Sequence, residues 1–157
     1  MRMTKSLNWK RAVRTTVLAV AVVTGVSACT MVKSMLGAGP ERPAESEFGL
    51  GPRVSQAGMY SVTLEPVAPL VKRKLQKVRV RVQDGAGNAV DGATIQVDGG
   101  MPQHGHGLPT KPRVTAALGD GRYEIDGVRF NMGGWWEFKL AIVAGARTDS
   151  VTFNLNL

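Results

Sequence analysis

Short runs in which every second residue is apolar recur through the last 100 or so residues and predict an antiparallel β domain. The clearest run is 77–83, where valine alternates with basic or polar residues, so one face is predicted to be buried and the other exposed. Gly, Asp, Asn and Pro separate the runs, as is typical of turns. The predicted strands are 59–64, 77–83, 93–97, 114–118, 121–125, 135–143 and 150–157.

The last two predicted strands carry broad apolar faces that can form much of a core. These faces comprise Trp136, Phe138, Leu140 and Ile142 on one strand and Val151, Phe153, Leu155 and Leu157 on the other. A short turn joins the two strands, so we expect them to pair. About seven strands in roughly 100 residues predict an all-β fold, an immunoglobulin-like antiparallel β-sandwich. A small open barrel is the alternative.

The N-terminal residues have the pattern of an export signal. A basic segment without acids precedes an uncharged apolar run at 15–28, which is too short for a permanent membrane span of ~20 residues. The run ends in Val26-Ser27-Ala28-Cys29, which resembles the lipobox of bacterial lipoproteins. The resemblance implies that Cys29 becomes the lipidated first residue. Ordinary cleavage after Ala28 and an uncleaved anchor are the alternatives.

The signal also predicts location and domain organisation. By the same lipoprotein resemblance, Thr30 stands where an Asp would favour the inner membrane, which implies a periplasmic protein anchored to the outer membrane through Cys29. Residues 1–28 are then the signal peptide. Residues 29–57, rich in Gly, Pro, Ala, Ser and Glu, form a flexible linker after the lipidated cysteine, and residues 58–157 form the β-sandwich.

Charge argues against a nucleic-acid partner. Five of the 20 basic residues precede Cys29 and all 12 acidic residues follow it, so processing lowers the net charge from +8 to +3. The basic positions 72–74, with Lys77, Arg79 and Arg81, are interpreted as a solvated strand face. Contact with lipid phosphates or an acidic partner is the alternative. The expected partners are the membrane, through the anchor, and an envelope protein.

The two histidines of the chain, His104 and His106, lie in a segment whose glycines and prolines predict a shaped loop. Met101 precedes this pair, and Met132 lies in a second glycine-rich bend. Imidazole and thioether ligands suit copper, so we hypothesise a copper site made of these four side chains. In the alternative, a histidine bonds a backbone carbonyl and the methionines fill the core.

Other chemistries have less support. Lipidation of the single cysteine leaves no thiolate in the fold, which disfavours both zinc and a blue-copper centre. No nucleophile elbow, phosphate loop or Ser-His-Asp pattern is present, so we expect no enzyme. Trp135 and Trp136 point to opposite faces of a strand, so we expect one to be exposed and take Trp135 as a partner-binding candidate; burial of both is the alternative. Tyr123 is expected to bond back to the backbone, as in a tyrosine corner.

Taken together, several segments resemble the YtkA-like/FixH-like domain family over residues 58–157. They are Gly58-Met59-Tyr60, Met101-Pro102, residues 104–110, Gly119-Asp120-Gly121-Arg122-Tyr123 and Phe130-Asn131-Met132-Gly133-Gly134-Trp135. The resemblance implies an extracytoplasmic immunoglobulin-like sandwich. Family members occur beside copper handling and the assembly of copper-containing respiratory oxidases.

By the same resemblance, the family's histidine loop falls on Met101, His104 and His106, and its Met-Gly-x-Trp turn falls on Met132, Gly133 and Trp135. The lipobox differs from the retained helix of inner-membrane members. Two functions remain open. One is a lipid-anchored copper-binding module that acts as a metallochaperone or buffer. The other is a metal-free protein-interaction module of an envelope complex.

Overall fold

Nine strands and two short 3-10 helices make up residues 39–157, the part of the chain that the computed structural model describes. The strands are β1 (Arg53–Val54), β2 (Tyr60–Pro66), β3 (Gln76–Asp84), β4 (Thr94–Met101), β5 (His106–Gly107), β6 (Arg113–Gly119), β7 (Arg122–Val128), β8 (Trp135–Ala144) and β9 (Arg147–Asn156). The 3-10 helices are η1 (Glu45–Glu47) and η2 (Pro102–His104). The predicted signal peptide, Cys29 and the first part of the predicted linker lie outside the described residues.

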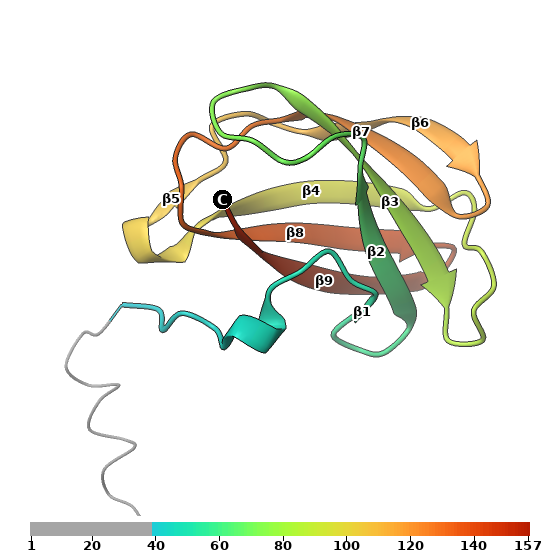
Figure 1. Cartoon of the computed structure of the whole chain (residues 1–157). Helices are drawn as coiled ribbons and strands as arrows, with labels where there is room; N and C mark the ends of the chain where they lie inside the picture. The colour runs from blue at the N-terminus through green and yellow to red at the C-terminus, as the bar shows by residue number, and fades with distance from the viewer. Residues whose placement is uncertain (1–38) are drawn as a thin grey trace, which may run out of the picture. The chain divides into compact units, whose positions relative to one another are not determined.

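The strands form two antiparallel sheets that pack as a sandwich (Figure 1). One sheet has the order β1-β2-β3-β7-β6, and the other has the order β5-β4-β8-β9. The predicted all-β sandwich is therefore confirmed. The alternative of an open barrel is wrong, because the strands divide into two separate sheets. Within residues 39–157 there is no helix with the length and hydropathy that a membrane span needs.

The core lies between the sheets and is built from the alternating positions that the sequence predicts. The inward valines of β3, Val78, Val80 and Val82, are fully buried. Strands β8 and β9 pair as expected, with Phe138 opposite Phe153. Ala38–Leu157 forms one compact unit, and every residue of its core cluster lies within that unit. The unit thus has its own hydrophobic core and is expected to fold alone.

Tyr123 of β7 ties the connection between β3 and β4 to the sheet. Its hydroxyl donates to the carbonyl oxygen of Val90 at 2.6 Å and accepts from the backbone N–H of Ala93 at 2.9 Å. The predicted bond from this tyrosine to the backbone is confirmed.

The segment before Gly58, which composition predicts as a flexible linker, packs against the sandwich in the structure. Strand β1 pairs with β2, and Phe48 forms a bridge with Asn154 of β9. Ser55 is buried. Individual contacts hold this part of the chain, and it has no continuous apolar face. Its sequence therefore shows no hydrophobic period of 2 or 3.6 residues that would predict the packing.

Asp149, near the start of β9, fixes the turn that leads into β2. Its carboxylate accepts from the Ser55 hydroxyl at 2.5 Å and from the backbone N–H groups of Ala57 and Met59 at 3.0 and 3.2 Å. Burial alone would raise the pKa of Asp149, but the hydrogen bonds from Ser55, Ala57, Ser150 and Met59 outweigh it and lower this pKa to about 2. We call these groups the Asp149 clasp.

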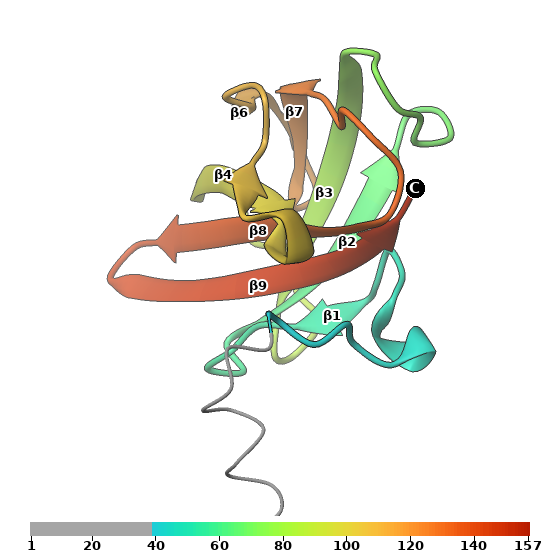
Figure 2. The same cartoon turned by 90° about the vertical axis from the view of Figure 1, so that its left-hand side faces the viewer.

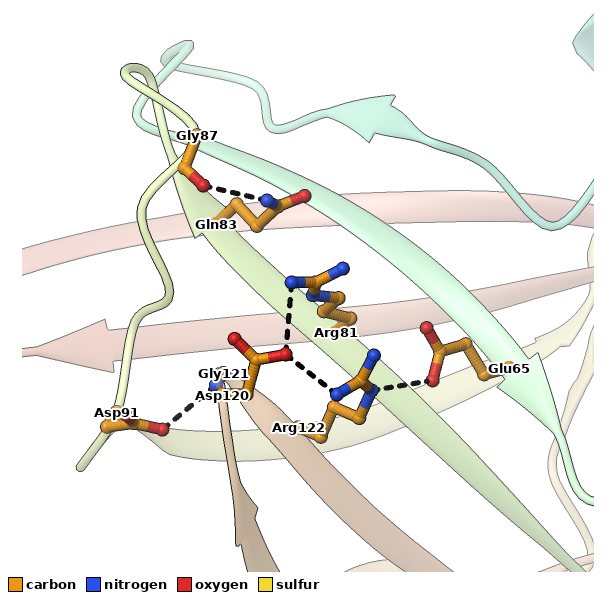
Figure 3. A network of polar contacts seen from close by, with 8 residues as sticks. All are labelled: Glu65, Arg81, Gln83, Gly87, Asp91, Asp120, Gly121 and Arg122. Atoms are coloured by element: carbon orange, nitrogen blue, oxygen red, sulfur yellow. Dashed lines mark hydrogen bonds and ion pairs between the residues drawn. The ribbon is translucent and has the colours of Figure 1, made fainter.

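The basic residues on the outer face of β3 are ion-paired. Asp120 accepts from Arg81 at 3.1 Å and from Arg122 at 2.8 Å, and Arg122 also reaches Glu65 (Figure 3). Lys77 pairs with Glu124 at 2.7 Å. This part of the predicted basic face is therefore largely neutralised by its neighbours.

Candidate functional site

The histidines lie in a tight hairpin at one end of the four-stranded sheet. Strand β4 runs to Met101, η2 turns the chain, and β5 returns so that His106 is opposite Met101. Gly105 closes the turn in the left-handed conformation, φ +66°, which glycine adopts without a steric penalty. The predicted loop is thus a short helical turn and a two-residue strand folded back on β4.

Close backbone contact holds this hairpin in place. A Cβ atom on Gly100 would lie only 2.5 Å from the carbonyl oxygen of His106, so only glycine permits the observed approach. The strand predicted at 93–97 ends before the glycine pair Gly99 and Gly100. In the structure β4 continues through them to Met101.

The two imidazole rings are exposed and close together. The ring centroids of His104 and His106 are 5.8 Å apart with an interplanar angle of 27°, and the His106 ring meets Trp136 edge-on at 6.0 Å. Among residues 39–157 the structure contains no hydrogen bond to either ring. The bond to a backbone carbonyl that was the alternative explanation for these histidines is therefore not found.

Met101 is next to this pair but faces the core. Its side chain is 2% exposed, and a Cβ atom on Gly134 would lie 3.1 Å from its Cε. Because directly opposed residues of an antiparallel pair project to the same face, Met101 and His106 leave the sheet on one side. A hollow of about 400 Å³ beside the hairpin is lined by both residues.

Met132 is joined to the histidines through Trp136. The indole N–H of the buried Trp136 donates to the Met132 carbonyl oxygen at 3.0 Å, and the Met132 side chain is 41% exposed. The bend before β8 and the β4–β5 hairpin thus meet at the end of the sandwich that faces the viewer in Figure 2. Trp136 is the residue that links them. The sequence pattern indicates it only as a core position of β8.

Trp135 lies on the other face of β8, where the N-terminal segment covers it. Its indole is 4% exposed and donates to Asn154 Oδ1 at 2.9 Å, and the Asn154 amide in turn reaches the Glu47 carbonyl. The expectation of an exposed tryptophan at this pair is therefore wrong. A partner could reach the Trp135 indole only by displacing its neighbours.

Comparison with known proteins identifies the family. A search of curated proteins finds no match to this chain. A solved structure of the ZirS C-terminal domain is 12% identical, with 96% of this chain and 99% of that chain covered and a TM-score of 0.38. The sequence profile of the YtkA-like family matches residues 55–141, more than half of the chain, a range that includes both histidines and Met132. The chain is therefore a YtkA-like β-sandwich protein.

Proposed function

We propose that this protein is a lipid-anchored periplasmic module that binds copper through the His/Met end of the sandwich and acts as a metallochaperone or buffer. The observation that carries the proposal is the meeting of two exposed imidazoles with the Met132 bend around Trp136. His104 and His106 would be the primary ligands. Met101 and Met132 would supply thioether sulfur.

The donor set fits copper better than other metals. Imidazole suits copper, and thioether sulfur favours Cu(I) in particular. Zinc and the harder cations prefer thiolate, carboxylate or several imidazoles. Among residues 39–157 no three His, Cys, Asp or Glu side chains are grouped so that they could hold a metal ion. A site at this end would therefore depend on methionine, which is the feature that selects for copper.

The location belongs to the same proposal. The signal pattern that ends at Cys29 would export the chain and attach it to the outer membrane. More than one acyl chain gives stable attachment. The proposal assigns no catalysis to this end, because the only two histidines of the chain lie beside each other in one hairpin and the sequence shows no Ser-His-Asp pattern.

An anaerobic Cu(I) competition titration of the fragment Ala38–Leu157, with a parallel Cu(II) titration, tests the proposal. We expect one-to-one binding that falls at least a hundredfold in the His104→Ala/His106→Ala variant, since even outer-shell changes cost ~10–100-fold. Gln103→Ala, an exposed neighbour in the same turn, is the matched control and should bind normally. Equal affinity in the histidine variant would reject the site.

Failure of that titration would favour the metal-free interaction module. The hairpin and the Met132 bend would then form a protein-binding surface. Capture of one defined envelope protein by the fragment, lost when residues 104–106 are changed, would support that function. Trp135 would contribute to such a surface only if the N-terminal segment moved away, because its indole is buried.

A further inference from the structure

The connection between β2 and β3, residues 67–75, exposes apolar side chains; we call it the β2–β3 loop. Val67, Val71 and Leu75 are 54%, 42% and 67% exposed. Leu50, which is 40% exposed, lines the same apolar hollow of about 680 Å³ as Val67. Single exposed aliphatic residues are ordinary, but three within nine residues, the first of which lines an apolar hollow, indicate a binding surface.

The same loop carries unneutralised positive charge. Lys72, Arg73 and Lys74 are exposed, and residues 66–75 contain no acid. Among residues 39–157 no carboxylate lies within ion-pair distance of these three side chains. The basic residues of β3, only a few positions further on, are all ion-paired. Sequence alone does not separate the two groups, whereas the structure does.

The β2–β3 loop is held in place by hydrogen bonds. The Gln76 side chain accepts from the Val71 N–H at 2.7 Å and donates to the Val71 carbonyl at 2.8 Å. The backbone N–H of Arg73 donates to the Phe130 carbonyl oxygen at 2.6 Å. Arg73 has φ +65°, a left-handed conformation that costs a residue other than glycine energy. The fold thus maintains a costly conformation in a loop whose apolar and basic side chains face solvent.

We propose that the β2–β3 loop docks on an anionic membrane surface. The aliphatic side chains would enter the headgroup region, and Lys72, Arg73 and Lys74 would contact lipid phosphates. Long basic side chains among aliphatic ones suit such a surface, because their stems can lie in the apolar layer while the charges reach the headgroups. An apolar protein partner would leave these three cations without partners.

The short distance along the chain between Cys29 and the folded unit agrees with docking on a membrane. If Cys29 is lipidated, as proposed above, the nine residues to Ala38 span at most ~30 Å, so the fold stays close to the bilayer. The loop is also next to the His/Met end, because a Cβ atom on Gly133 would lie 3.2 Å from Lys72 Nζ. Docking would hold that end near the membrane.

Vesicle flotation of the unlipidated fragment Ala38–Leu157 tests this proposal separately from the anchor and from copper. The probe is a vesicle of equal parts phosphatidylglycerol and phosphatidylethanolamine, compared with pure phosphatidylcholine. We expect binding to the anionic vesicles that weakens by roughly 25-fold in Lys72→Gln/Lys74→Gln, at about fivefold per basic residue. The matched control Lys111→Gln/Arg147→Gln removes the same charge from exposed positions outside the loop and should bind as the parent does.

A second variant tests the apolar contribution. Val71→Ser/Leu75→Ser keeps the charge and should weaken binding at least tenfold, because two aliphatic side chains no longer leave water. Near-ultraviolet circular dichroism of each variant verifies the fold. Equal binding to both vesicle types, no binding to either, or an unchanged affinity in both loop variants would overturn the proposal. If the parent fragment binds no vesicles but crosslinks to an envelope protein, and the loop variants abolish the crosslink, the loop binds a protein partner instead of a membrane.

Discussion

Polar side chains lie beside the core in two regions of the sandwich, near the β8–β9 turn and at the β4–β5 hairpin, but the two sets differ in how they are partnered. At one end, Asp149 is buried, and Ser55 and several backbone N–H groups donate to its carboxylate. At the other, His104 and His106 are exposed, their rings lie beside each other and beside Trp136, and among the described residues no hydrogen bond or ion pair engages either ring. A fully partnered group stabilises the fold, whereas unpartnered donors on a fixed hairpin are available to a ligand. The comparison predicts that stability depends on one end and binding on the other.

The largest effect on stability should come from the Asp149 clasp. Asp149→Ala removes the acceptor of the Ala57 and Met59 backbone N–H groups and the short bond from the Ser55 hydroxyl, which should cost about 3 kcal/mol of unfolding free energy. Chemical denaturation of the fragment Ala38–Leu157 measures this. Asp126→Ala, in which the lost side chain is 45% exposed, is the control and should cost less than 1 kcal/mol. Equal losses of unfolding free energy in both variants would show that the Asp149 clasp stabilises the fold no more than an exposed carboxylate does.

Low pH should reduce the stability that the Asp149 clasp contributes. Because the pKa of Asp149 is about 2 in the folded protein and 3.8 ordinarily, its contribution is fully present above about pH 4 and is lost as pH falls toward 2. The unfolding free energy of the parent should therefore decline across this window more steeply than that of Asp149→Asn. Parallel pH profiles for the two proteins would contradict the assignment.

Tyr123 makes a smaller contribution of the same kind. Tyr123→Phe removes one donated and one accepted hydrogen bond without changing the packing of the ring, so we expect a loss of about 1 kcal/mol. Denaturant titration should show it as a lower midpoint at constant slope. A variant as stable as the parent would mean that water replaces both bonds without cost.

The smallest effect on stability should come from Met132, and its effect should instead fall on binding. Met132→Leu changes a side chain that is 41% exposed, so stability should stay within about 0.5 kcal/mol while Cu(I) affinity falls about tenfold. Met59 directly precedes β2 and is 37% exposed, so Met59→Leu is a matched control that should bind Cu(I) with the parent's affinity. Equal Cu(I) affinities in the two variants would remove Met132 from the ligand set.

Alternation along the chain was enough to predict the sandwich and its main core pairs, because each strand buries one face and wets the other. Residue chemistry likewise singled out His104 and His106. The pattern failed where structure depends on isolated contacts. The covering of Trp135 by the N-terminal segment rests on a few anchors, and the extension of β4 through Gly100 rests on a close backbone approach. Neither leaves a periodic signal.

The link between Met132 and the histidines also could not be predicted. It passes through Trp136, which belongs to neither motif and whose sequence context shows only a core position. The separation of paired from unpaired basic residues is similar, since Lys74 and Lys77 are three positions apart but only Lys77 meets carboxylates. Such distinctions need the three-dimensional positions of the partners.

The most direct test of the account measures copper affinity and unfolding free energy together in two variants of the fragment Ala38–Leu157. His104→Ala/His106→Ala should lose at least a hundredfold in copper affinity with stability within about 0.5 kcal/mol of the parent. Asp149→Ala should lose about 3 kcal/mol of stability and, under conditions where it is folded, bind copper normally. Unchanged copper affinity in the histidine variant, or a large loss of stability in it, would contradict the division between a structural and a binding end.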